Sequence, residues 1–208
     1  MKFVNLKLPT FENAPHIQWN EHTAIDLKKI LAKQNITQIN RVIDIGGWWG
    51  GWSLHWTEQA KQIEIFEPNQ EIIPALLENT QQFRHITVHQ TALYKADGTA
   101  GLQYESHSGT CHLDHGKKID TVQLRTLDSY NFSKVDIIKI DAEGSEYFIL
   151  QGAEQTIRQN KPFVQIEVTK HAGLKYKITK NRLTTLLESF GMERIYKKHP
   201  DQIWAFTK

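Results

Sequence analysis

The sequence predicts an α/β protein with a doubly wound, mostly parallel sheet, and three observations predict it. Short apolar runs alternate with segments of helical periodicity along most of the chain. Several of these runs carry an acid at or beside their carboxyl end, and a glycine-rich turn follows the first. Two apolar segments around Pro200 and Asp201 close the chain, which is typical of an antiparallel terminal hairpin.

Length and composition favour a single soluble domain. The chain has 208 residues, of which 39% are hydrophobic and 23% charged. We expect one domain, with an arm and covering helix over residues 1–40 and a Rossmann-like body over residues 41–208. The net charge of +2 is too small to indicate a nucleic-acid partner or an anionic membrane.

Cysteine content and the first residues predict the compartment. The single cysteine, Cys111, excludes an internal disulfide. The segment Met1–Pro9 has no apolar run long enough for a signal peptide or a membrane span. A cytoplasmic location is therefore expected, or the host cytoplasm if the source is viral.

The first forty residues predict an irregular arm and then a helix. Pro9 and Pro15 interrupt a segment without clear periodicity. Apolar residues recur at helical spacing between Thr23 and Gln34, so we expect a covering helix there.

The stretch Arg41–Trp56 reads RVIDIGGWWGGWSLHW and predicts a strand, a turn and a helix. Val42 to Ile45 is the strand, Gly46–Gly51 the turn, and Ser53–Lys61 the helix. Such a junction exposes backbone N–H groups beside a surface that a ligand can approach, as in nucleotide pockets. The alternative is that the glycines serve only the backbone of the turn.

A second strand, Ile63–Glu67, ends in a carboxylate that can accept both hydroxyls of a ribose. A dinucleotide fingerprint requires a glycine where Trp48 stands, because the backbone must contact a pyrophosphate. S-adenosylmethionine has a ribose but no phosphate. The junction therefore favours S-adenosylmethionine over NAD.

The rest of the chain continues the alternation. We expect helices and strands of the main body, with a small antiparallel β insert near residues 91–124, at these positions: helix 68–82, strand 86–90, insert strands 100–104 and 119–124, strand 135–141, helix 145–159, strand 163–168, helix 183–190, and hairpin strands 193–196 and 203–206.

Five motifs occur in order: VIDIGGWWGGWSL, IEIFEPN, TLDSY, VDIIKIDAEGSEYFILQGAE and VQIEV. Together they resemble the FkbM-type S-adenosylmethionine-dependent methyltransferases, over roughly Arg41 to Val168. The resemblance implies a class I methyltransferase (Rossmann-like) fold, with seven strands of which the last is antiparallel. It also implies O-methylation of hydroxyl groups, often on sugars.

The resemblance also implies a role for individual residues. Around the methionine part of the cofactor it places Asp44, Gly46, Gly47, Trp48 and Gly50, and on the ribose Glu67 with Pro68. Beside the adenine it places Thr91 and Ala92. At the sulfonium it places the loop with Asp141, Glu143 and Gly144. The family usually has Ala-Asn where this chain has Gly47 and Trp48, and the His-rich part of the insert has no obvious family counterpart.

Methyl transfer to an alcohol requires aligned partners and a base for the hydroxyl proton. Asp141 and Glu143 follow the fourth predicted strand and are the candidate bases, with Glu146 as a secondary candidate. Capping of the next helix is the alternative role of these acids. In the insert, His112 and His115 are further candidates for a base or a substrate contact, and a solvent-exposed loop is their alternative.

A divalent ion, Mg²⁺ or Mn²⁺, is a further hypothesis. Asp141, Glu167 and His171 offer hard ligands that can hold an ion against two sugar oxygens. Ordinary hydrogen bonding of these carboxylates is the alternative. The order Cys-His-Leu-Asp-His in the insert is not a zinc spacing.

Tryptophans crowd around the glycine turn and predict contacts with a sugar ring. Trp49 is expected to face the pocket, whereas Trp52 and Trp56, four residues apart on the predicted helix, fit core packing. Glu143, Glu167 and His171 complete the expected substrate contacts.

The sequence thus predicts an S-adenosylmethionine-dependent O-methyltransferase with a carbohydrate or glycan acceptor and neither a nucleic-acid nor a membrane partner. Its alternatives are a non-catalytic carbohydrate-binding module that uses the tryptophans, or a methyltransferase of a nucleic-acid base or another small molecule.

Overall fold

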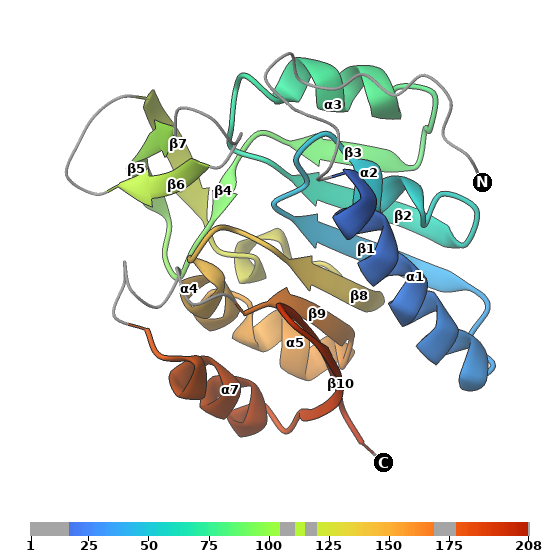
Figure 1. The fold of residues 1–208 in the computed structure, drawn as a ribbon. Coiled ribbons are helices and arrows are strands. Elements are labelled where there is room, and N and C mark those ends of the chain that lie inside the picture. The colour runs from blue at the N-terminus through green and yellow to red at the C-terminus, as the bar shows by residue number, and fades with distance from the viewer. Residues whose placement is uncertain (1–16, 105–110, 115–119, 169–177, 208) are drawn as a thin grey trace.

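The computed structural model describes residues 17–104, 111–114, 120–168 and 178–207. Its main sheet has seven strands in the order β10-β11-β9-β8-β1-β2-β3 (Figure 1). Only β11 runs opposite to the other six strands, so the predicted mostly parallel sheet with a terminal hairpin is confirmed. The strands are β1 (Ile39–Ile45), β2 (Ala60–Phe66), β3 (Ile86–His89), β8 (Val135–Ile140), β9 (Phe163–Glu167), β10 (Glu193–Lys198) and β11 (Asp201–Ala205).

The strand order reverses at β1, which pairs in parallel with β2 on one side and with β8 on the other. The chain runs outward from β1 through β2 to β3, and later outward from β8. Connections therefore leave the carboxyl ends of β1 and β8 in opposite directions, which opens a crevice there for a ligand. This switch point is where the sequence predicts the site.

Helices cover both faces of this sheet, because alternate strand residues are apolar on each side. Val42 contributes to a core with α1 (Ile17–Lys33), α2 (Gly51–Leu54) and α3 (Ile73–Thr80). Its neighbour Ile43 contributes to a core with α4 (Glu146–Gln151), α5 (Glu154–Asn160) and α7 (Lys180–Ser189). Within the described ranges, no helix is long and apolar enough to cross a membrane.

The predicted β insert forms a second sheet in the order β4-β7-β5-β6, at the end to which the parallel strands point (Figure 1). Two of its four strands had no counterpart in the sequence prediction. Tyr94 packs its ring against Phe148 of α4 at 4.9 Å, which joins the small sheet to the main body. The strands are β4 (Ala92–Leu93), β5 (Gly98–Tyr104), β6 (Cys111–Asp114) and β7 (Asp120–Arg125).

The helix predicted after the glycine turn is wrong in length. Helix α2 is only the four residues Gly51–Leu54. The next N–H groups, of His55 and Trp56, bond three residues back rather than four, which winds the chain into tight turns before β2 begins. The turns direct the chain back to the sheet within a few residues.

The helix predicted over residues 145–159 is divided into α4 and α5 at Gly152. A Cβ at Gly152 would overlap the carbonyl oxygen of Tyr94, so the chain packs closely against the small sheet there. The carboxylate of Asp128 then accepts from the backbone N–H groups of Gln155 and Thr156 at 3.1 and 2.8 Å, which starts α5 anew.

Three other helices differ from the prediction at their starts, and the smallest difference is at α7, which begins at Lys180 rather than at residue 183. Helix α1 begins at Ile17 rather than Thr23. Helix α3 begins at Ile73 rather than at residue 68, because side chains hold the intervening backbone in a turn. The Asn69 N–H donates to Glu67 Oε1 at 2.8 Å, and the Glu71 N–H donates to Asn69 Oδ1 at 2.9 Å.

Candidate active site

The glycine turn after β1 brings the ends of three strands together. The N–H groups of Gly46 and Gly47 both donate to the carbonyl of Phe66, at 3.0 and 3.1 Å. Gly46 has φ of 76°, and a Cβ there would overlap the carbonyl oxygen of Asp141. Gly50 has φ of 93° and precedes α2. The glycines thus permit the close contact between β1 and β8 that forms the floor of the switch point.

Glu67 follows β2 and is 5% exposed. Its Oε2 accepts from the Trp48 N–H at 2.9 Å and its Oε1 from the Asn69 N–H at 2.8 Å. Burial raises the pKa of Glu67 to about 7, although these two N–H donors work against the rise. Each oxygen retains a further lone pair, so the carboxylate can accept two hydroxyl groups, which fits the predicted ribose contact. Pro68, which separates Glu67 from Asn69 in the sequence, is half-buried.

Asp44 lies beneath the turn and is fully buried. Its carboxylate accepts from Ser53 Oγ at 2.6 Å and from Lys139 Nζ at 3.0 Å. Lys139 also donates to the carbonyl of Gly46 at 2.8 Å. Burial works to lower the pKa of Lys139, but the charges of Asp44 and Asp141 outweigh it and the pKa is raised. The pair therefore fixes the turn on β8.

The loop after β8 is held by a buried carboxylate. Glu146 is 3% exposed, and its Oε1 accepts from the backbone N–H groups of Ala142 and Gly144 at 3.1 and 3.0 Å. Glu146 thus holds the loop before α4, whereas Ser145, the N-cap residue of α4, makes no side-chain capping hydrogen bond. Glu143 lies between these donors, is exposed and has φ of 48°. The loop conformation of Glu143 is therefore imposed by Glu146.

Three carboxyl groups meet beyond this loop. Asp141, whose side chain is 29% exposed, hydrogen-bonds Glu167 at the end of β9. Asp201, the first residue of β11, is the register partner of Glu167. Burial, with the charges of Asp141 and Glu143, raises the pKa of Glu167 strongly. Burial and Asp141 likewise raise the pKa of Asp201 to about 7. We call Asp141, Glu167 and Asp201 the carboxyl cluster.

Three of the four tryptophans around the turn are buried. Trp49 is 1% exposed and covers Gly51 with its ring, so the prediction that it faces the pocket is wrong. Trp52 and Trp56 contact each other in the core at 5.5 Å, which confirms their predicted packing. Trp48, in the left-handed region with φ of 50°, is half-buried, so part of its surface remains exposed at the turn.

Other predicted residues lie apart from the cluster or outside the described chain. Thr91 and Ala92 follow β3 where the chain passes into the small sheet, and Ala92 pairs with Leu124. His112 lies in β6, but its side chain is outside the described residues, as are His115 and His171 entirely. The described part of the chain contains no group of three His, Cys, Asp or Glu side chains suited to a metal ion. Of the three predicted metal ligands, only Asp141 and Glu167 are thus described, and metal binding by them stays a prediction.

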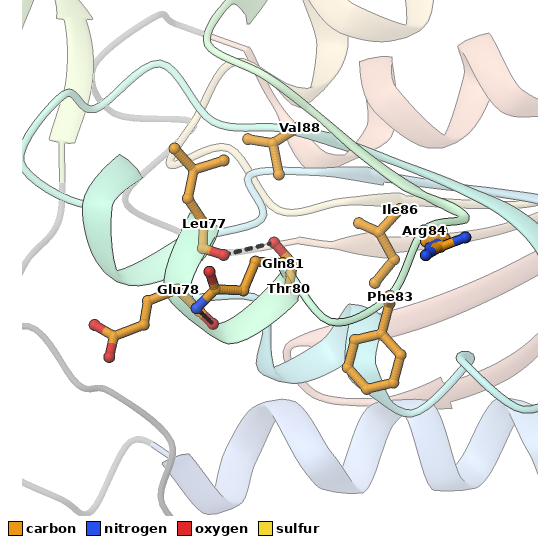
Figure 2. Close-up of a pocket in the computed structure, with 8 residues that line it drawn as sticks. All are labelled: Leu77, Glu78, Thr80, Gln81, Phe83, Arg84, Ile86 and Val88. Carbon is orange, nitrogen blue, oxygen red and sulfur yellow. Dashed lines mark hydrogen bonds between the residues drawn. The ribbon is translucent and has the colours of Figure 1, made fainter.

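A groove of about 480 Å³ lies elsewhere, between α3 and the edge strand β3 (Figure 2). Its one hydroxyl, on Thr80, donates to the carbonyl of Leu76 at 2.8 Å within its own helix. None of the predicted site residues lines it. The lining residues are Leu77, Glu78, Thr80, Gln81, Phe83, Arg84, Ile86 and Val88.

Sequence reasoning missed Lys139 and Asp201. Lys139 is the charged residue within the otherwise apolar end of the run VDIIKI, and a charge in a strand buried on both faces requires a partner. Asp201 begins a strand antiparallel to β9, so its start meets the end of β9. That position follows from the hairpin topology rather than from any local motif.

A family model described as the Methyltransferase FkbM domain matches residues 50–191. Among curated proteins, no sequence matches this chain. The crystal structure of Methyltransferase FkbM from Methylobacillus flagellatus KT superposes with a TM-score of 0.58 and 19% identity, over 81% of this chain and 44% of that one. This chain thus spans less than half the length of that protein.

Two further solved structures share the fold. Fibrillarin from Aeropyrum pernix, in complex with natively bound S-adenosyl-L-methionine, has a TM-score of 0.51 and 12% identity, over 81% of this chain and 67% of that one. The N-methyltransferase NodS from Bradyrhizobium japonicum WM9 has 0.52 and 11%, over 93% and 97%. Identities this low show the fold alone, and the predicted class I methyltransferase (Rossmann-like) fold is confirmed.

Proposed function

The chain belongs to the FkbM methyltransferase family, and on this premise we propose that it transfers a methyl group from S-adenosylmethionine to a sugar hydroxyl in a glycan or glycosylated metabolite. The observation that carries the proposal is that Glu67 and the carboxyl cluster lie on the two sides of one switch point. Glu67 supplies acceptors for a ribose, and the cluster supplies a base for a hydroxyl. Trp48 is the candidate for an aromatic contact with either ligand.

The cofactor, when bound, supplies a methyl group already activated by positively charged sulfur. The residues of this chain then have to hold the partners and accept a proton. Glu67 would hold the ribose hydroxyls, and the Gly46–Gly50 turn would limit the approach of the methionine part.

Asp141 is the candidate base. Its hydrogen bond with Glu167 places one proton between two carboxyl groups, because two adjacent carboxylates do not both ionise readily. Asp141, 3.8 Å from Lys139 Nζ, is the one we assign as ionised. It would take the hydroxyl proton while Glu167 stays protonated beside it.

Burial of Trp49, Trp52 and Trp56 argues against the carbohydrate-binding module, because their ring faces are not available to a sugar. The proposal is tested by calorimetric titration with S-adenosylmethionine and S-adenosylhomocysteine, with and without glycan acceptors. We expect micromolar cofactor affinity that increases as pH rises through about 7, where Glu67 ionises.

A Glu67→Gln variant should bind the cofactor about 10- to 100-fold more weakly, because charge-assisted hydrogen bonds to the ribose are lost. Glu64→Gln is the matched control. Glu64 is buried on the same strand but three residues away, so its side chain lies on the opposite face and bonds His89 at 2.8 Å. Absence of cofactor binding by the unmodified protein would refute the proposal.

A further inference from the structure

Gln165 lies at the floor of the carboxyl cluster. It precedes Glu167 by two residues on β9, so both side chains lie on the same face of the sheet. Its amide N–H donates to Asp201. The carboxamide oxygen, Oε1, is buried and has no hydrogen-bond partner in the described structure. The residue is 2% exposed, and a buried oxygen without a hydrogen-bond partner is unfavourable.

Negative charge in the cluster exceeds the positive charge beside it. Lys139 Nζ is 3.0 Å from Asp44 but 3.8 Å from Asp141, so most of its charge is used beneath the glycine turn. Glu167 and Asp201 have no ion-pair partner among the described residues. Three carboxyl groups thus share the weaker contact of a single ammonium.

The carboxyl oxygens of the cluster and the amide oxygen of Gln165 can all accept hydrogen bonds. A sugar hydroxyl would satisfy one of them and bring a lone pair of its own. An ammonium group offers three N–H donors, no acceptor, and a positive charge. It therefore complements the Asp201 carboxylate, the free carboxyl oxygen of Glu167 and the amide oxygen of Gln165 better than a hydroxyl does.

From this geometry we infer that the carboxyl cluster, at the carboxyl ends of β8 and β9 and the start of β11, binds a protonated amine of the acceptor, held by Asp201, Glu167 and Gln165 Oε1. The inference rests on the proposed function, because it describes the acceptor of that reaction. It narrows the acceptor class to amino sugars or other amine-bearing polyols. Asp141 remains the base for the hydroxyl that receives the methyl group.

The test compares glucosamine, glucose and N-acetylglucosamine, which differ in one substituent. Binding is measured by calorimetry or ligand-observed NMR on the cofactor-free protein, so that it does not depend on methyl transfer. We expect glucosamine to bind at least about tenfold more tightly than the other two, as a charge-assisted hydrogen bond provides.

Asp201→Asn should remove most of this preference and leave glucose affinity within about twofold of the unmodified protein. Gln165→Met should weaken glucosamine binding in the same direction. Asp97→Asn, which removes an exposed carboxylate paired with Arg125 in the small sheet, is the control and should change nothing. A circular-dichroism melt of each variant verifies that it folds.

Equal binding of glucose and glucosamine would overturn the inference, as would a glucosamine preference that survives both cluster variants. Titration with Mg²⁺ alone provides the remaining comparison. Asp201-dependent Mg²⁺ binding without glucosamine binding would mean a metal site instead. Because the cofactor is absent, failure here is distinct from loss of cofactor binding, which concerns Glu67.

Discussion

The glycine turn and the carboxyl cluster are adjacent at the switch point, but their acids are treated differently. In the turn, Glu67 accepts two backbone N–H groups and Asp44 accepts a hydroxyl and an ammonium. In the cluster, by contrast, Asp141 hydrogen-bonds Glu167 and, with burial, raises the pKa of Glu167. One region is therefore satisfied by the protein itself, and the other is crowded with like charge.

The difference indicates that the glycine turn stabilises the fold, whereas the carboxyl cluster destabilises it. A satisfied carboxylate rigidifies the backbone around it, so the turn is preorganised for a ligand of fixed shape. Crowded carboxyl groups oppose folding, and such groups concentrate at functional sites. Lys139 contacts both regions, so it is the first residue with which to separate them.

Lys139→Met should give the largest effect. It leaves Asp44 buried without its cation, and breaking a buried pair in this way destabilises by about 4 kcal/mol. Urea unfolding at pH 7 measures the change. Arg125→Met removes an exposed pair with Asp97 and is the control, at about 1 kcal/mol or less. Equal small effects would mean that Asp44 is not held as an anion and that the turn is not the satisfied region.

Trp49→Ala should destabilise by about 3 kcal/mol, because a fully buried ring is removed. The value is at the low end for tryptophan, since the Trp49 Nε1 has no hydrogen-bond partner among the described residues. Trp48→Ala is the matched variant next to it and should change stability by less than about 1 kcal/mol. It should instead weaken cofactor or acceptor binding. The reverse pattern would restore Trp49 as the pocket residue.

The sequence was sufficient to predict the turn because everything it needs is local. The apolar run, the glycines and the acid that follows β2 lie within thirty residues, and the doubly wound topology determines where they meet. What periodicity could not predict is how tightly the turn is packed. Gly51 allows Trp49 to fold inward over it, whereas the place of Trp49 in the glycine turn had suggested that its indole faces the pocket.

The cluster is less accessible to sequence reasoning, because its members come from β8, β9 and β11. Strand-end acids identified Asp141 and Glu167, but Asp201 lies at the start of its strand and only the antiparallel pairing with β9 brings it there. The break of the long predicted helix at Gly152 has a similar cause. It depends on the backbone of Tyr94, which belongs to the small sheet.

An effect that appears only as pH rises tests whether crowding extends to the loop that supports the cluster. Burial raises the pKa of Glu146 from 4.5 to about 7, so above pH 4.5 the folded protein binds this proton more tightly than the unfolded chain does. The stability that Glu146 provides is complete below pH 4.5 and is lost as pH rises through about 7. Glu146→Gln keeps an oxygen for the Ala142 and Gly144 N–H groups but cannot ionise.

We therefore expect the free energies of unfolding of Glu146→Gln and the unmodified protein to diverge between pH 4.5 and 8, with the variant gaining at most about 3 kcal/mol. Urea unfolding at several pH values measures this divergence. Glu188→Gln, an exposed change on α7, should give a curve parallel to that of the unmodified protein. If the Glu146→Gln curve is parallel as well, the two N–H donors fully offset the cost of burying the carboxylate, and the expected divergence is wrong.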